Sequence, residues 1–237
     1  MSSQNQKVAI VTGASQGIGA GVVDAYRKLG YGVVATSRTI APADDADILT
    51  VQGDIADPAT AERVVAAAIE RFGRIDTVVN NAGIFVAKPF TDYTADDYAT
   101  VIGINLTGFF RITQLAIPRM LTQGGGHIVN VTTSLVDNAD ARVPSALASL
   151  TKGGLQSATK SLAIEYATRG IRANAVSPGT IKTPMHPEDT HAGLAGLHPV
   201  GRMGEVSDIV DAVVFLENAP FVTGEILHVD GGMSAGH

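Results

Sequence analysis

The sequence predicts an α/β fold built on one doubly wound parallel sheet. Short runs of β-branched residues alternate with longer segments of helical period along the whole chain. Most of these runs are continuously apolar, which is typical of strands that helices cover on both faces. No linker rich in proline, glycine or serine divides the 237 residues. We therefore expect a single domain over 1–237.

Local patterns place the elements in order. A helix over 18–29 follows the first strand, and a second helix over 59–72 has Asp57 as N-cap, Pro58 at its first position and Gly73 at its end. Residues 178–204 lack a clear period, and we expect a substrate-lid loop at about 179–204, beyond a strand end where ligands gather. The strands are expected at 8–12, 32–36, 48–52, 77–80, 127–132, 171–176 and 225–229.

Composition and charge exclude several classes of protein. Apolar residues make up 45% and charged residues 17% of the chain, which excludes disorder. A net charge of −6 without a basic cluster argues against nucleic acid as a partner. Cysteine is absent, so disulfides, thiolate catalysis and cysteine-ligated metals are excluded. The polar start Met1–Lys7 and the lack of an apolar run of ~18 residues predict a cytoplasmic protein with no membrane partner.

A glycine-rich turn joins the first strand to the first helix. It contains Gly13, Gly17 and Gly19, and glycine lets the backbone turn tightly and approach a ligand closely. The helix that follows offers unpaired N–H groups and the positive end of its dipole. This arrangement predicts a diphosphate-binding loop.

The spacing G-x-x-x-G-x-G resembles that of the short-chain dehydrogenase/reductases. Further motifs of that family follow in the same order and span nearly the whole chain. The resemblance implies a Rossmann-type oxidoreductase that uses a nicotinamide cofactor and a small-molecule substrate. These motifs are Gly53-Asp54-Ile55, Asn80-Asn81-Ala82-Gly83, Asn105, Lys152, the segment from Ser177 to Thr183, and Asp230-Gly231-Gly232.

The resemblance also implies which residues contact the cofactor. Asp54 and Ile55 are expected at the adenine, and Asn81, Ala82 and Gly83 on the side of the adenosine ribose. Asn81 and Asp54 have a structural alternative, since either side chain also suits the capping of a turn or loop. The other expected contacts are Gly13, Ser15, Gln16, Gly17, Ile18 and Gly19 at the phosphates, Lys152 at the nicotinamide ribose, and Pro178, Gly179, Ile181 and Thr183 around the carboxamide.

The end of the second strand favours NADP (NADPH). NAD-dependent relatives carry an acidic residue there, whereas this chain has Ser37 followed by Arg38. A guanidinium beside a hydroxyl can bind a 2′-phosphate with charge-assisted hydrogen bonds. The alternative is that Arg38 points to solvent and NAD binds without a decisive contact.

The family's proton donor is missing from its expected place. The resemblance places a tyrosine four positions before Lys152, where this chain has Ala148. A catalytic hydroxyl is expected at Thr133, with Ser134 as the second choice, and Asn105 is expected to hold a water in a proton relay. Positioned acid catalysis contributes about 10²–10⁴-fold, or roughly 3–5.5 kcal/mol, so an ordinary carbonyl reductase should suffer from the loss.

Three functions remain open. The first is an NADP-dependent oxidoreductase that retains hydride transfer to a C=N or C=O bond through a replacement donor or a relay of water, Lys152 and Asn105. Imines fit the missing acid best, because an iminium ion already carries the proton, and Asp137 and Asp140 are candidate acidic residues of the pocket. The second is a carbonyl or alcohol enzyme that carries a Tyr-to-Ala change at 148. The third is a dinucleotide-binding sensor or partner subunit with weak catalysis.

Histidines and assembly complete the predictions. His186, His191 and His198 lie in the lid loop, where one of them is a candidate acid/base. Their spacing matches no helix face, so we predict no metal site. By resemblance the chain forms a homodimer or homotetramer through the helices that carry Asn105 and Lys152. From the residues alone, an apolar stripe of Leu155, Ala158, Leu162 and Ala163 suits packing on another subunit.

Overall fold

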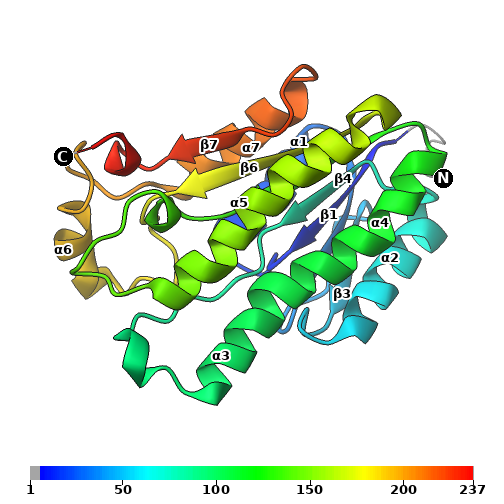
Figure 1. Cartoon of the computed structure of the whole chain (residues 1–237). Helices are drawn as coiled ribbons and strands as arrows, with labels where there is room; N and C mark the ends of the chain where they lie inside the picture. Colours follow the sequence, from blue (N-terminus) through cyan, green and yellow to red (C-terminus); the bar gives the residue numbers. More distant parts are fainter. Residues whose placement is uncertain (1–5, 237) are drawn as a thin grey trace.

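The computed structural model describes residues 6–236, so the polar start Met1–Asn5 lies outside the described residues. Within 6–236 a seven-stranded parallel sheet has the order β3-β2-β1-β4-β5-β6-β7 (Figure 1). The strand order reverses between β1 and β4, which is the point where ligands bind in such sheets. The predicted α/β fold with one doubly wound parallel sheet is confirmed.

The strands agree closely with the sequence prediction. Three of them have the predicted bounds, and the others differ by one or two residues at an end. Most strands are buried along their length because helices cover both faces of the sheet. The strands are β1 Val8–Thr12, β2 Gly32–Ser37, β3 Ile48–Gln52, β4 Thr77–Asn80, β5 Gly126–Val131, β6 Ile171–Pro178 and β7 Ile226–Val229.

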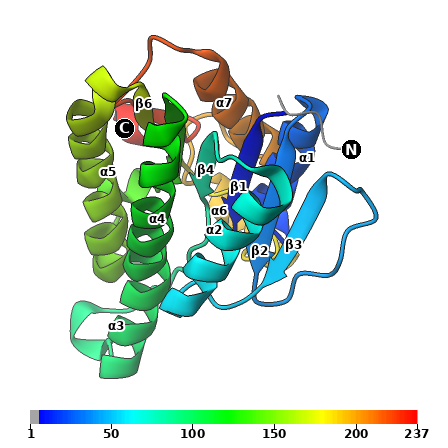
Figure 2. The ribbon, with the colours of Figure 1, turned by 90° about the vertical axis from the view of Figure 1, so that its right-hand side faces the viewer.

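The helices form two layers. The layer made of α2, α4 and α5 covers one face of the sheet, and α1 with α7 covers the other (Figure 2). The helices are α1 Gly17–Lys28, α2 Pro58–Phe72, α3 Ala95–Ile102, α4 Gly108–Thr122, α5 Ala146–Tyr166, α6 His191–Ala195 and α7 Val206–Asn218.

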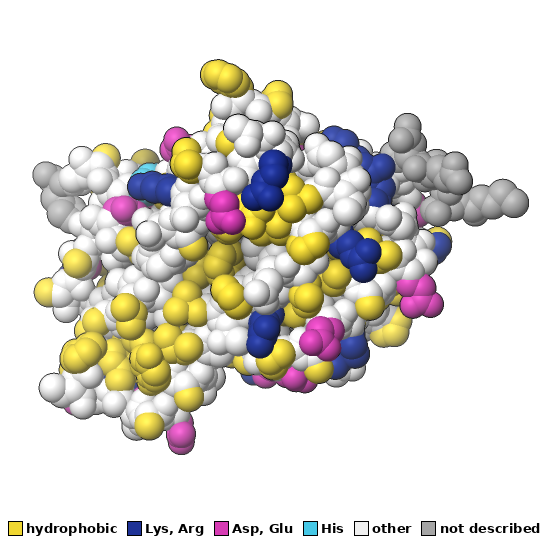
Figure 3. Space-filling view, turned by 45° about the vertical axis from the view of Figure 1, so that its right-hand side comes forward, with side chains coloured by type: hydrophobic (Ala, Val, Ile, Leu, Met, Phe, Trp, Pro, Cys, Tyr) yellow, Lys and Arg dark blue, Asp and Glu magenta, His cyan; other side chains and the backbone are white. Residues whose placement is uncertain are grey.

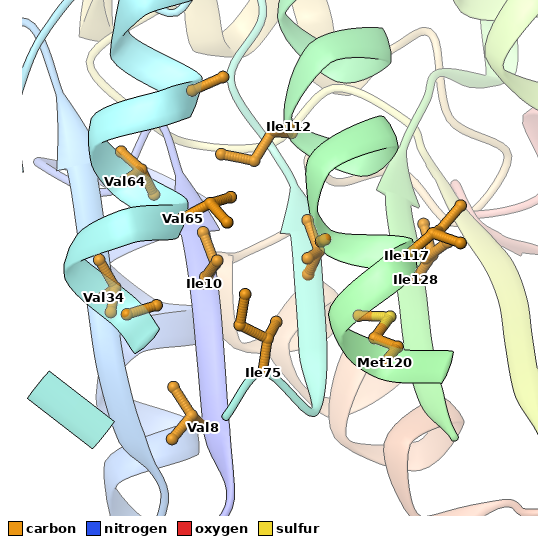
Figure 4. Close-up of a cluster of buried hydrophobic side chains, with 14 of the residues drawn as sticks. Val8, Ile10, Val34, Val64, Val65, Ile75, Ile112, Ile117, Met120 and Ile128 are labelled. Atoms are coloured by element: carbon orange, nitrogen blue, oxygen red, sulfur yellow. The ribbon is translucent and has the colours of Figure 1, made fainter. Parts of the chain in front are cut away.

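The hydrophobic core on the α2 and α4 side fixes these helices on the sheet. Ile10 and Ile128 project from β1 and β5 toward Val64 of α2 and toward Ile112 and Met120 of α4 (Figure 4). All five side chains are fully buried. Burial of such a side chain contributes roughly 1.5–3 kcal/mol, so this layer holds the strand ends in fixed positions.

Local signals set the ends of α2 as the sequence predicts. The Asp57 carboxylate accepts a hydrogen bond from the Ala59 N–H at 3.0 Å, and Pro58 occupies the first turn. Gly73 ends the helix with φ = 79°, a conformation that favours glycine. This N-cap, proline and closing glycine explain why the prediction from sequence was accurate here.

A long helical segment runs from α3 into α4. The segment Ala95–Thr122 is long and apolar enough to cross a membrane by length and composition alone. In the fold, Ile112, Ala116 and Met120 of this segment pack into the core beneath the sheet, which accounts for its hydrophobicity. Five residues of π-helix, Gly103–Thr107, separate α3 from α4.

The predicted lid loop contains more structure than the sequence indicates. Strand β6 extends to Pro178, and a short helix, α6, forms within the segment. An isolated parallel bridge joins Ile181 to Gly204 and ties the two ends of the segment together. Helix α6 lies beyond the carboxyl ends of β6 and β7 (Figure 1). Five residues are too few for a helical period to show in the sequence.

The predicted apolar stripe on α5 is wrong in part. Leu155 and Ala163 are buried against the body of the protein, so they do not form an open face. The exposed apolar residues of α4 and α5 are instead Phe110, Leu150 and Ile164. Figure 3 shows broad hydrophobic areas on this side of the molecule.

A buried carboxylate joins elements at the amino ends of the strands. Glu217 of α7 accepts hydrogen bonds from Tyr26 (2.9 Å), Tyr31 (2.8 Å), Thr77 (3.0 Å) and His127 Nδ1 (2.9 Å). Burial by itself raises the pKa of the Glu217 carboxyl, but these donors outweigh it and lower the pKa to about 2. Burial also lowers the pKa of His127, so we infer a neutral imidazole that donates from Nδ1.

Glu217→Gln tests this cluster. The amide cannot accept from four donors, so we expect the free energy of unfolding to fall by about 2–4 kcal/mol at neutral pH. In the native protein the carboxylate's contribution is complete above its ordinary pKa of 4.5 and is lost as the pH falls toward about 2. Urea denaturation at several pH values measures both effects. Glu225→Gln, at an exposed position, is the control, and an equal loss in both variants would contradict the assignment.

Candidate active site

A cavity of about 510 Å³ opens at the carboxyl ends of the strands. Its walls come from the ends of β1, β2, β4, β5 and β6, from the start of α5 and from the lid segment. The site therefore spans the point where the strand order reverses. Because these ends belong to one buried sheet, the residues that follow them are held in fixed relative positions.

Most of the residues predicted for the site line this cavity. The two exceptions among them are Asn105 and Asp137. The predicted residues that do line it are Gly13, Ser15, Gln16, Gly17, Ile18, Gly19, Ser37, Arg38, Asp54, Ile55, Asn81, Ala82, Gly83, Thr133, Ser134, Lys152, Pro178, Gly179, Ile181 and Thr183.

The turn between β1 and α1 is a cradle that tolerates no side chain at its centre. Gly13 and Gly17 have φ values of 65° and 56°, which favour glycine. A Cβ atom on Gly19 would lie 2.1 Å from the Gly13 carbonyl oxygen. No side chain caps the N-terminus of α1, and its first turn contains no acidic residue. The free N–H groups at this end suit an anionic ligand such as a diphosphate.

Asn81 holds the cradle in place from the end of β4. Its Nδ2 donates hydrogen bonds to the carbonyl oxygens of Thr12 (2.9 Å) and Gly13 (3.1 Å). The Thr12 hydroxyl accepts from the backbone N–H groups of Asn81 (3.1 Å) and Ala82 (3.0 Å). Asn81 therefore braces the turn, which is the structural alternative that the sequence left open, and it lines the cavity at the same time.

Two side chains of opposite charge occupy the end of the cavity near β2 and β3. Arg38 is exposed, and its guanidinium makes no hydrogen bond or ion pair with the part of the chain that the structure describes. Asp54 lines the same end and accepts a hydrogen bond from the Ala56 N–H at 3.0 Å. Asp54 thus caps its own loop, whereas Arg38 is free to meet an anionic ligand.

Lys152 places a buried ammonium in the floor of the cavity. Its Nζ donates a hydrogen bond to the Val131 carbonyl oxygen at 2.7 Å, at the end of β5. The residue is 8% exposed, and within the described residues no carboxylate pairs with it. Burial lowers the pKa of the Lys152 ammonium to about 8. An acid with a pKa near neutrality is well matched to proton transfer at physiological pH.

Ala148 lies one turn before Lys152 on the same face of α5. It is buried and lines the same cavity as Lys152, so position 148 presents a methyl group and no proton donor. The two candidate hydroxyls follow β5. The Thr133 hydroxyl accepts from the Leu135 N–H at 3.3 Å and keeps its own proton available, whereas Ser134 is buried with its hydroxyl 3.7 Å from the Met233 sulfur. Both line the cavity, and the choice between them stays a prediction.

Asn105 lies behind the cavity wall, and its expected part in a proton relay stays a prediction. Its side chain is 1% exposed and does not line the cavity. Oδ1 accepts from the Ile84 N–H at 2.9 Å, and Nδ2 donates to the Ile84 carbonyl (3.1 Å) and to the Thr151 hydroxyl (3.2 Å). The amide sits in the π-helical turn and anchors the backbone that follows β4.

Asp137 is also not brought to the cavity. Its carboxylate lies on the outer side of the loop after β5 and accepts hydrogen bonds from Gln156 and His228, both at 3.0 Å. Asp140 forms an ion pair with Arg142. The prediction that Asp137 makes the pocket acidic is therefore wrong, because partners far apart in the sequence hold this carboxylate elsewhere.

The three histidines of the lid have different environments. His198 is buried; its Nε2 accepts from the Thr180 N–H at 2.9 Å and its Nδ1 contacts the Leu194 carbonyl at 3.1 Å, so it is a neutral structural residue. His186 lines the cavity with Nδ1 bound to the Ile181 carbonyl. His191 contacts the His186 carbonyl and does not line the cavity.

The other end of the cavity is apolar, and sequence reasoning missed most of it. These side chains come from the loops after β4 and β5, from the lid and from the segment after β7, where no motif marks them. Only the folded chain brings these residues together around one cavity. The residues are Phe85, Leu135, Val143, Pro184, Met185, Leu194, Leu197 and Met233.

A glycine cradle at the switch point of a doubly wound sheet is the architecture of dinucleotide-binding enzymes. The family model described as enoyl-(acyl carrier protein) reductase matches residues 13–234. The chain is 35% identical to the 3-oxoacyl-[acyl-carrier-protein] reductase of Salmonella typhimurium, over 96% of this chain and 97% of that protein. The chain belongs to the short-chain dehydrogenase/reductase family.

Solved structures agree with this assignment. The 3-ketoacyl-(acyl-carrier-protein) reductase from Brucella melitensis, complexed with NADH, has a TM-score of 0.89 at 32% identity and covers 98% of this chain and 100% of its own. A blue fluorescent protein from a metagenomic library, in complex with NADPH, has a TM-score of 0.87 at 36% identity and covers 97% and 98%.

Gly19→Ala tests the cradle. Its Cβ would collide with the Gly13 carbonyl and with the Asn81 amide at 2.6 Å, so the turn must open. We expect a lower melting temperature and at least about tenfold weaker dinucleotide binding, since a loss of ~1.4 kcal/mol suffices for that factor. Calorimetry and thermal denaturation measure both quantities. Gly193→Ala is the matched control because nothing lies within 4 Å of its Cβ position, and equal effects of the two changes would contradict the cradle.

Proposed function

We propose that the protein is an NADP(H)-dependent oxidoreductase that reduces a C=N or C=O bond without a tyrosine acid. The observation that carries this proposal is that Ala148, one turn before the buried Lys152, presents only a methyl group to the cavity that also contains the phosphate cradle. Bound in this cavity, the reduced nicotinamide would supply the hydride. The chain's own residues would then orient the substrate and provide the proton.

NADP(H) is the cofactor that the site supports best. Arg38 stands free at the end of β2, where a 2′-phosphate would need a cation. The glycine cradle and the uncapped N-terminus of α1 suit the diphosphate. Lys152, Ile181 and Thr183 line the cavity where the resemblance places the nicotinamide end.

An imine is the substrate class that best suits an active site without a tyrosine acid at position 148. An imine nitrogen is basic, so an ammonium with a pKa of about 8 can protonate it before hydride arrives. A carbonyl oxygen is too weakly basic for that, and Lys152 can offer it only a hydrogen bond. Reduction of the protonated imine gives a neutral amine and leaves no alkoxide in the apolar cavity. Thr133 remains available to orient the nitrogen.

A carbonyl reductase is the second candidate. The curated relative from Salmonella is named as a 3-oxoacyl reductase, and the cavity retains a hydroxyl at Thr133 and a cation at Lys152. A weakly catalytic sensor or partner subunit would need the same cofactor half of the site.

The proposed homodimer or homotetramer would use the exposed apolar residues Phe110, Leu150 and Ile164 of α4 and α5. A cytoplasmic location remains part of the proposal.

Arg38→Ala tests the choice of cofactor. A charge-assisted hydrogen bond contributes about 1.5–3 kcal/mol, so we expect NADPH to bind roughly 10–100-fold more weakly while NADH binding changes little. Isothermal calorimetry with both cofactors measures the difference. Arg71→Ala, on the outside of α2 and away from the cavity, is the control. Equal losses for the two cofactors would reject the 2′-phosphate contact.

Turnover on matched cyclic imines and ketones tests the reaction, with NADPH oxidation as the readout. We expect imines to be reduced faster by the native protein, and Ala148→Tyr to raise ketone reduction by roughly 10²-fold because it restores a positioned acid. Ala148→Phe fills the same space without a hydroxyl and separates acid catalysis from packing. Comparable ketone turnover in the native protein would discard the imine preference. No turnover together with firm NADPH binding would favour the sensor.

A further inference from the structure

At the substrate end of the cavity, the described side chains able to pair with an anionic group are Lys152 and His186, and the Nδ1 of His186 is already bound to the Ile181 carbonyl. Among the described residues that line the cavity, Arg38 and Asp54 lie at the opposite end, near β2 and β3. Most other side chains at this end are apolar, such as Phe85, Leu135 and Leu194, and the hydroxyls of Thr133 and Ser134 lie among them. Lys152 is buried and donates to the Val131 carbonyl, so part of its hydrogen-bonding capacity is already used.

The cations on the segments that border the cavity are already paired. Lys88 lies in the loop after β4. Its backbone N–H donates a hydrogen bond to the Pro144 carbonyl, next to the lining residue Val143. Each of these cations meets a carboxylate: Lys88 pairs with Asp97, Arg142 with Asp140, and Lys182 with Glu205. An anionic group at the entrance would therefore have to compete with these carboxylates for the cations.

We propose that the substrate is a free small molecule with an apolar body and no anionic group. This inference rests on the proposed function and specifies its substrate class. A carboxylate moved into these walls would lose its hydration without gaining a partner. Phosphates of a coenzyme A or carrier-protein thioester would meet a border of paired charges on a chain of net charge −6. The substrate thus differs from the acyl carrier protein thioesters in the names of several relatives.

Binding to the NADP⁺-loaded protein tests the inference without requiring turnover. The probes are 4-phenylbutan-2-ol and its para-carboxylate, together with the N-acetylcysteamine and coenzyme A thioesters of 3-hydroxybutyrate. We expect calorimetry to show each neutral probe binding at least about tenfold more tightly than its anionic partner. Equal affinities, tighter binding of an anionic probe, or no binding of the neutral probes would overturn the inference.

Met185→Lys provides the matched variant. Met185 is half exposed and lines the cavity from the lid, so a lysine there would add an unpaired cation at the substrate end. We expect the carboxylated probe to gain at least about tenfold in affinity in this variant and not in Met185→Gln. An equal gain with glutamine would show that charge is not the determinant.

Turnover separates this inference from the proposed function. If the neutral probes bind selectively but no imine or ketone is reduced, the proposed function fails and the substrate class stands. If substrates with and without a carboxylate are reduced equally well, the substrate class fails and the oxidoreductase remains.

Discussion

The buried ammonium of Lys152 is the constraint on which the site depends. A lysine inside a protein is costly unless it is paired, and this one has the Val131 carbonyl as its hydrogen-bond partner and no carboxylate among the described residues. Its position ties α5 to the end of β5 and so fixes where Ala148 and Thr133 lie relative to each other. The same burial lowers its pKa to about 8, which makes it an acid suited to neutral pH. The burial of Lys152 therefore explains both the fixed position of α5 against β5 and the proposed proton transfer.

Much of the fold and of the cofactor half could be predicted from the sequence because the determinants are local. Asp57, Pro58 and Gly73 define α2 within a few residues of its ends, and the glycines of the cradle lie next to each other along the chain. Each predicted contact in this half follows a strand end. A parallel sheet brings such ends together whatever the side chains between them.

The rest of the site depends on partners far apart in the sequence, which no local pattern reports. In the sequence, Asp137 is a suitable acidic residue for the pocket. In the structure its carboxylate is bound outside the cavity to His228, which is 91 residues further along the chain. The sequence makes His198 a candidate acid, but in the structure its Nε2 accepts a hydrogen bond from the Thr180 N–H. The cluster around Glu217 unites residues from β4, β5, α1 and α7, and the sequence analysis assigned it no role.

The two halves of the cavity are built by different means, and this has a consequence for specificity. The cradle is a backbone structure that Asn81 and the Thr12 hydroxyl brace, so a substitution at Gly19 disturbs the fold itself. The substrate walls are side chains on loops and on a lid that the Ile181–Gly204 bridge and His198 hold in place. Side chains such as that of Met185 can change without moving the cradle, so the choice of substrate can change while cofactor binding is kept. In the proposed function, Ala148 at the position where the family resemblance implies a tyrosine is a change of this kind, since it would alter proton supply at one point and leave the cradle unchanged.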